Sequence, residues 1–171
     1  SLNPLAFSFS SLYKGQMILA SHSDDGYLGG ITIYEYDYNS GVWERKFYEK
    51  GKCESGIPGC NYPWVPALGL DSSIHKNIAV AGASQILNGT SGYNGAVYVY
   101  RKDSYDVWNK AEIIHNPFPE TGANFGHGVD VFEDTLVIGA LGAGNEHNDS
   151  AGPGRVYIYK DGVDGFELEH T

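Results

Sequence analysis

The stretch FGHGVDVFEDTLVIGA (residues 125–140), followed by GPGRVYIYK (residues 152–160), decides the fold of this chain. The first stretch alternates apolar and polar residues, turns at Phe132-Glu133-Asp134 and resumes as an apolar run, which is typical of two strands joined by a tight hairpin. The second stretch alternates β-branched residues with tyrosines. It predicts a strand with two packed faces, the tyrosine hydroxyls reaching solvent.

The same order of segments occurs three times along the 171 residues. Each copy has an apolar strand ending in small residues, a polar loop, a strand that opens on glycine, and a closing aromatic residue. The aligned glycines and closing aromatics are Gly30, Gly95 and Gly154, and Trp43, Trp108 and Phe166. Such self-similarity indicates a repeat architecture in which neighbouring units bury one another.

Four short strands per copy predict an all-β chain of three four-stranded antiparallel blades, with no helix longer than two turns. The predicted repeats span about residues 5–50, 62–115 and 121–171, within one domain that covers residues 1–171. Closed propellers have four or more blades. We therefore expect a partial β-propeller, with an open sheet face that a further blade would bury.

The repeats resemble FG-GAP repeats, the β-propeller repeats of integrin α-chains and bacterial surface proteins. Each copy has one short pair at the start of its first strand and a pair of small residues at the end of its second. In chain order these pairs are Phe9-Ser10 and Ala20-Ser21, Leu68-Gly69 and Gly82-Ala83, and Phe125-Gly126 and Gly139-Ala140. The first copy is degenerate and the third is the most specific, and the resemblance covers nearly the whole chain.

The calcium loop of integrin-type repeats, Asp-x-Asp-x-Asp-Gly-x-x-Asp, is not found between the first two strands of any copy. Calcium takes about six to eight oxygen ligands, whereas the corresponding segments, residues 13–16, 71–76 and 132–135, hold at most two carboxylates each. The six histidines show no paired metal spacing, and no nucleophile or phosphate-loop motif occurs. We expect no metal site, no cofactor and no catalytic residue.

Net charge and hydropathy exclude two classes of partner. The chain carries a net charge of −10 with only 11 Lys and Arg residues, so a phosphate backbone would be repelled and no nucleic acid is expected. No apolar run approaches the length of about 18 residues that a membrane span requires.

Two features favour the secretory pathway. Cys53 and Cys60 enclose a short Gly/Pro-containing loop, for which we expect a local disulfide rather than free thiols. Asn88 and Asn148 begin N-glycosylation sequons in the same polar loop of successive repeats. Equivalent loops of neighbouring blades lie on one rim, so we predict glycans there and an extracellular, secreted or cell-surface location.

The resemblance and the open blade together indicate a non-catalytic extracellular module for structure, adhesion or recognition. Its partners would be proteins, neighbouring subunits or further propeller blades. A carbohydrate-binding, lectin-like propeller is one alternative, for which Tyr27 and Tyr93 are the aromatic residues in the polar loops. The other is an accessory domain of a secreted hydrolase whose catalytic domain lies outside this chain.

Overall fold

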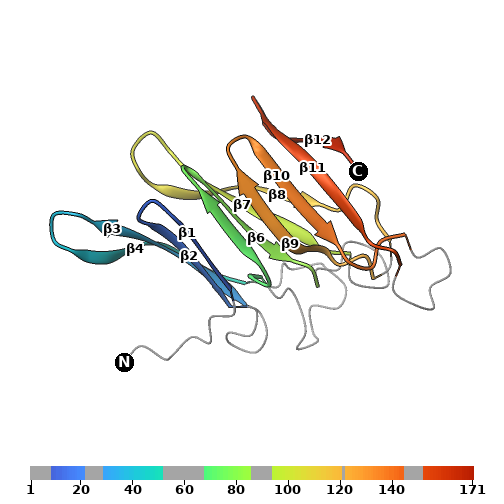
Figure 1. The fold of residues 1–171 in the computed structure, drawn as a ribbon, viewed down its shortest axis with the longest axis horizontal. Helices are drawn as coiled ribbons and strands as arrows, with labels where there is room; N and C mark the ends of the chain where they lie inside the picture. Colours follow the sequence, from blue (N-terminus) through green and yellow to red (C-terminus); the bar gives the residue numbers. More distant parts are fainter. Residues whose placement is uncertain (1–8, 22–28, 52–67, 86–93, 121, 145–151) are drawn as a thin grey trace.

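The computed structural model describes residues 9–21, 29–51, 68–85, 94–120, 122–144 and 152–171. Over these residues the chain is all-β, with three four-stranded antiparallel sheets and no helix. The expected fold class is confirmed. Figure 1 shows the three sheets side by side in sequence order along the long axis of the molecule. We refer to them as blades 1, 2 and 3.

Each blade is a simple meander in which every strand pairs with the next one along the chain. Blade 1 contains β1 (Phe9–Tyr13), β2 (Gln16–Ser21), β3 (Gly30–Asp37) and β4 (Val42–Lys50). Blade 2 contains β5 (Ser72–His75), β6 (Ile78–Ala83), β7 (Ala96–Lys102) and β8 (Trp108–His115). Blade 3 contains β9 (Phe125–Phe132), β10 (Thr135–Ala140), β11 (Arg155–Gly162) and β12 (Gly165–His170).

A two-residue turn joins the first two strands of every blade, as the hairpin pattern predicts. The first turn residue has a positive φ in all three, at 42° for Lys14, 53° for Lys76 and 54° for Glu133. Such turns match the right-handed twist of the strands they join. The three turns therefore align the blades residue by residue.

This register corrects two details of the sequence alignment. Ala20 pairs with Ile31 as Gly82 pairs with Val97, so Gly29, and not Gly30, is equivalent to Gly95. The error arises because two glycines are adjacent there.

The second correction concerns the first strand of blade 1. Phe9 pairs with Ala20 as Gly128 pairs with Gly139, so Phe9 is equivalent to Gly128 rather than to Phe125. The dipeptide of the first repeat that corresponds to Phe125-Gly126 therefore falls N-terminal to the described residues, and the assignment of Phe9-Ser10 is wrong.

The β-branched face of one blade packs on the tyrosine face of the next. Val80, Val97 and Val99 of blade 2 are fully buried in one core with Tyr157 and Tyr159 of blade 3. Branched residues of blade 1 make the same contact with tyrosines of blade 2; these residues are Ile18, Ile31, Ile33, Tyr98 and Tyr100. The two packed faces that the alternating strands predict are confirmed.

The expected solvent exposure of the tyrosine hydroxyls is wrong for tyrosines that lie between two blades. Tyr100 and Tyr157 are fully buried, because the neighbouring blade covers the whole ring. The Tyr157 hydroxyl donates instead to the buried Asn116 side chain, with 3.2 Å between the two oxygens. Burial also raises the pKa of Tyr159 to about 12, so the Tyr159 side chain stays neutral in the packed interface.

Polar side chains join the blades around this apolar packing. Glu35 of blade 1 accepts hydrogen bonds from the Lys102 ammonium and the Trp108 indole of blade 2, both at 3.0 Å. Two guanidinium nitrogens of Arg101 in blade 2 donate hydrogen bonds to the two carboxylate oxygens of Asp161 in blade 3, at 3.0 and 2.6 Å. The arginine pair is bidentate, which fixes its orientation.

Candidate functional site

Blade 3 leaves its β-branched face uncovered. By register, Val137 and Val156 are equivalent to Val80 and Val97 of blade 2. The blade 2 residues are 0% exposed, whereas Val137 is 37% and Val156 55% exposed. Apolar residues that are buried in one repeat and exposed in the next mark an interaction surface, and the same sheet face is involved in both.

A groove with a floor of glycines lies at one end of this face. It has a volume of about 430 Å³, and Gly128, Gly139 and Gly154 form part of its lining. Leu141 and Val156 supply apolar walls, and the exposed His127 also contributes. The lining is apolar apart from a few groups, which suits binding of a nonpolar segment.

The equivalent position of blade 2 is covered by blade 3. A Cβ placed on Gly82 would overlap the carbonyl oxygen of Gly126, and one on Gly95 would overlap the backbone of Phe125. Gly95 and Phe125 form a parallel bridge, in which the Phe125 amide donates to the Asn94 carbonyl at 3.0 Å. The dipeptide Phe125-Gly126 therefore inserts its backbone into blade 2.

Blade 1 receives blade 2 in the same way. Gly29 and Leu68 form the second parallel bridge, and the Gly30 amide donates to the Leu68 carbonyl at 3.0 Å. Gly69 follows Leu68 as Gly126 follows Phe125. In contrast, a Cβ on Gly139 would meet nothing nearer than the Gly128 carbonyl oxygen at 3.7 Å, so the groove of blade 3 is the third and open copy of one joint.

Comparison with known protein families identifies the segment that contains this joint. Residues 108–159 match the model of the FG-GAP repeat. This segment is an FG-GAP repeat. It begins on β8 and ends within β11, so the sequence unit starts on the outer strand of blade 2 and crosses into blade 3. No curated protein is significantly similar to the chain in sequence.

The FG-GAP residues singled out from the sequence come together across the blade boundary. Phe125 and Gly126 of one blade lie on Gly82 and Gly95 of the previous one. Gly139 and Ala140, the same motif in blade 3, line the open groove. The sequence analysis paired these motifs within a repeat and missed that they meet between repeats. The signal was the pair Gly82 and Gly95, because a position without a side chain lets another backbone approach closely.

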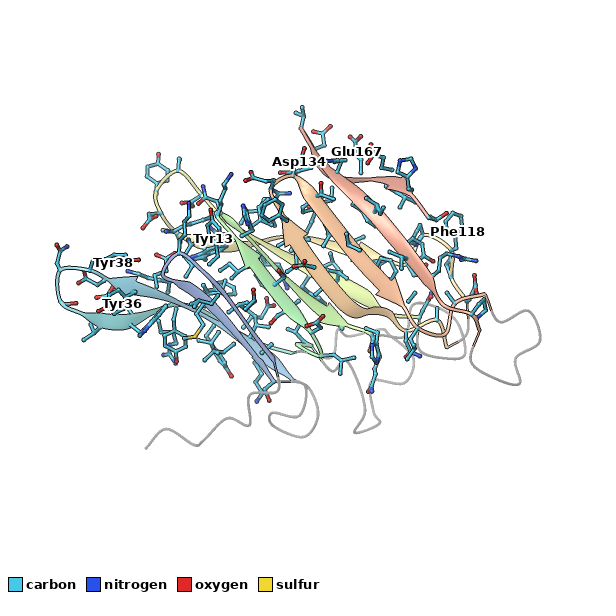
Figure 2. The ribbon with its side chains drawn as sticks, viewed as in Figure 1. Tyr13, Tyr36, Tyr38, Phe118, Asp134 and Glu167 are labelled. Atoms are coloured by element: carbon cyan, nitrogen blue, oxygen red, sulfur yellow. The ribbon has the colours of Figure 1, made fainter. Side chains whose placement is uncertain are left out.

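The innermost strands carry a second set of contacts that sequence reasoning missed. The residue before each turn is aromatic, and the three rings contact one another from blade to blade. The centroid distances are 4.3 Å for Tyr13–His75 and 4.6 Å for His75–Phe132. Phe132 is the last ring of this ladder and is 65% exposed. Figure 2 labels Tyr13 at the end of the first hairpin, beside blade 2.

In blades 1 and 2, a serine two residues before the ladder residue links the same strands. The Ser11 hydroxyl accepts a hydrogen bond from the Ile74 amide, and the Ser73 hydroxyl accepts one from the Val131 amide, both at 3.3 Å. Asp130 occupies this position in blade 3 and already accepts from the Ser73 hydroxyl at 2.7 Å. Its carboxylate offers further lone pairs at the open edge.

The turn beyond Phe132 is acidic. A hydrogen bond from Lys76 lowers the pKa of Glu133, and hydrogen bonds from Lys160 and Thr135 lower that of Asp134. Both carboxylates therefore stay ionised at neutral pH. Figure 2 labels Asp134 on this turn. The inner end of the open face is thus apolar at Phe132 and negatively charged beside it.

The other predicted sites lie outside the described residues. These are the disulfide partners Cys53 and Cys60, the sequon residues Asn88 and Asn148, and the loop aromatics Tyr27 and Tyr93; all remain predictions. Among the residues that the structure describes, no three His, Cys, Asp or Glu side chains are grouped to hold a metal ion. The same residues contain no helix long and apolar enough to cross a membrane.

Proposed function

We propose that the chain is a non-catalytic extracellular recognition module that binds a protein partner through the open face of blade 3. One observation carries the proposal. Val137 and Val156 are exposed at the positions where Val80 and Val97 are fully buried by the next blade. The covered repeats support the proposal, because the equivalent face of each packs on another blade.

The apolar area supplies a driving force for such binding. Leu141, which lines the groove together with Val156, extends the exposed surface that Val137 and Val156 begin. Full burial of a side chain of this size contributes roughly 1.5–3 kcal/mol. A handful of such residues is enough to anchor an interface, provided that the partner matches their shape.

The composition of the groove favours binding over catalysis. Among the described residues that line it, His127 and Arg155 are the two with titratable side chains. Arg155 is held by Glu120, with 2.8 Å between nitrogen and oxygen. A general acid or base needs a partner that orients it toward a reacting group, and His127 stands alone at the rim.

The extracellular assignment rests on sequence features. Sequons at Asn88 and Asn148 and the spacing of Cys53 and Cys60 support it. Glycans on one rim would leave the open sheet face accessible, because the rim and the sheet faces are different surfaces of a blade.

Exposed aromatics on blade 1 do not favour the carbohydrate-binding alternative. Tyr36 contacts Tyr38 and Trp43, at centroid distances of 5.0 and 5.4 Å, and Figure 2 shows Tyr36 and Tyr38 on the blade farthest from blade 3. Trp43 is equivalent by register to Trp108, which is buried against blade 1. The open tyrosine face accounts for the exposure of this cluster.

A photo-crosslinker tests the proposal directly. We would place benzoylphenylalanine at Val156, in the open face, and at Val163, which is fully exposed in the β11–β12 turn. In the cells that make the protein, we expect a discrete protein adduct from position 156 and none from position 163. Equal yields at both positions, or no adduct at 156, would remove the proposed binding face.

A further inference from the structure

We propose that the glycine-floored groove of blade 3 binds a large apolar residue followed by glycine, presented by the inner hairpin of a blade in a partner. This deepens the proposed function, on which it rests, by naming the chemistry of the partner. The two covered joints of this chain serve as the templates, and each feature they share is also present at the groove.

The second residue of the dipeptide must be glycine. Gly69 and Gly126 have φ values of 91° and 84°, in the left-handed region that side chains disfavour. A Cβ on Gly126 would lie 2.5 Å from the Ala96 carbonyl oxygen. A Cβ on Gly69 would lie 2.9 Å from the Gly30 carbonyl oxygen. Any other residue at this place would push the strands apart.

The first residue of the dipeptide must be large and apolar. Phe125 is fully buried and Leu68 almost fully, and Phe125 shares a buried core with Val80 and Val97 of blade 2. In blade 3, Val156 and Leu141 line the groove and are exposed, so they can contact such a side chain. Burial of a phenylalanine or leucine there contributes most of the affinity.

The backbone of the groove can repeat the two bonds of the covered joints. The Phe125 amide donates to Asn94, and the Gly30 amide donates to the Leu68 carbonyl. By register the equivalent groups in blade 3 are the Pro153 carbonyl and the Arg155 amide. The partner residue would donate to the first and accept from the second, as an added strand does.

The inner strand offers two more contacts in the same register. Asp130 takes the place of Ser11 and Ser73, whose hydroxyls accept an amide of the next blade. Phe132 takes the place of Tyr13 and His75, whose rings contact the next ring. A partner hairpin that places its dipeptide in the groove thereby brings its own inner strand to both residues.

A second copy of this chain does not fit the groove. Leu68 and Phe125 each lie eight residues before the first residue of the following turn. The same spacing before the first turn of blade 1 gives Ala6-Phe7, a dipeptide that lacks the glycine. Each copy also carries a net charge of −10, which opposes self-association. The occupant we propose is therefore a blade that carries the apolar–glycine pair, and not blade 1 of a second copy.

The experiment uses a peptide that already fills one joint. The probe is a fluorescent, head-to-tail cyclised peptide with the sequence of residues 123–142. Cyclisation is compatible with the hairpin, because the Gly142 amide donates to the Ala123 carbonyl at 3.0 Å, and it reduces the entropy lost on binding. We expect saturable binding to the full chain by fluorescence anisotropy, with methyl NMR shifts at Val137 and Val156.

Two matched changes test the mode of insertion. The Gly126→Ala peptide should bind at least about tenfold more weakly, because its Cβ meets the groove wall. The Gly139→Val chain should lose binding by a similar factor while keeping its melting temperature, since the position is open and β-branched residues suit strands. The Val163→Ser chain should bind as the parent does.

Several outcomes would overturn the inference. These are equal binding of both peptides, no saturation up to about 1 mM, or NMR shifts away from blade 3. If the chain alone sediments as an oligomer that the peptide dissociates, the occupant is a second copy and the proposed partner is wrong. A specific adduct from the crosslinker at Val156, with no peptide binding, would leave the proposed function standing and remove the dipeptide mode alone.

Discussion

Gly82 and Gly139 occupy the same position in successive blades, but their surroundings differ. The carbonyl of Gly126 lies on Gly82, whereas a Cβ on Gly139 would make only ordinary van der Waals contacts, the nearest at 3.7 Å. Among the described residues, another blade covers Gly82 and none covers Gly139. A single added methyl group therefore tests the joint between blades 2 and 3 with the blade 3 position as its internal control.

We expect Gly82→Ala to destabilise the chain by about 1–3 kcal/mol, because the new Cβ forces the two blades apart. Gly139→Ala should change the free energy of unfolding by less than about 1 kcal/mol, and the smaller entropy of its unfolded chain favours the folded state. Urea unfolding followed by tryptophan fluorescence measures both. Equal destabilisation by the two substitutions would contradict the assignment of the joint.

At the scale of single elements, the Glu35 carboxylate on β3 joins blade 1 to both β7 and β8 of blade 2. Burial raises the pKa of Glu35, but the hydrogen bonds from Lys102 and Trp108 outweigh it and hold the pKa below the ordinary value of 4.5. The folded state thus binds the proton less readily than the unfolded state. This contribution to stability is complete above the ordinary pKa and is lost as pH falls through the lowered folded pKa.

Glu35→Gln should remove that pH dependence. At neutral pH we expect a loss of roughly 1.5–3 kcal/mol, typical of hydrogen bonds to a charged group. Between about pH 6 and pH 3 the parent should lose more stability than the variant, so that the two unfolding curves converge in acid. Parallel curves over this range would show that Glu35 does not carry the effect.

The strands and turns could be predicted because their signals are local. Alternation along residues 156–159 and the polar pair Glu133-Asp134 determine a strand and a hairpin wherever they occur. The position of the Phe-Gly equivalent in the first repeat could not be predicted. In blade 3, which served as the reference, the strand pairing shifts between Gly139 and Ala140, and the sequence does not show this shift. Continued without this irregularity, the register would pair Phe125 with Gly142, whereas Phe125 pairs with Ala140, two residues away.

The joint itself could not be predicted from local pattern. Gly82 and Gly126 are far apart in sequence, and nothing in either segment shows that one lies on the other. The ladder of Tyr13, His75 and Phe132 has a visible signal, an aromatic residue before each turn, but its meaning depends on the distance between neighbouring blades. Contacts of this kind follow from the stacking of repeats and not from any one repeat.

At the scale of the whole molecule, the predicted rim modifications await a test on native material. We expect mass spectrometry of the protein purified from its own cells to find glycans on Asn88 and Asn148. The same digest, kept non-reduced, should show Cys53 linked to Cys60. Unmodified asparagines together with free thiols would argue against the extracellular assignment, while leaving the binding face to its own test.

The two outer sheet faces of the three-blade body are unlike, one lined by tyrosines on blade 1 and the other by branched residues on blade 3. Association between unlike surfaces has a direction, and it continues until a ring closes or a unit fails to offer the next surface. This chain accepts a blade at its C-terminal side, but at the other side its sequence has Ala6-Phe7 in place of an inserting dipeptide. If the proposed groove requires an apolar–glycine pair, Ala6-Phe7 makes blade 1 of one copy a poor match for blade 3 of another, which would disfavour head-to-tail growth into fibres.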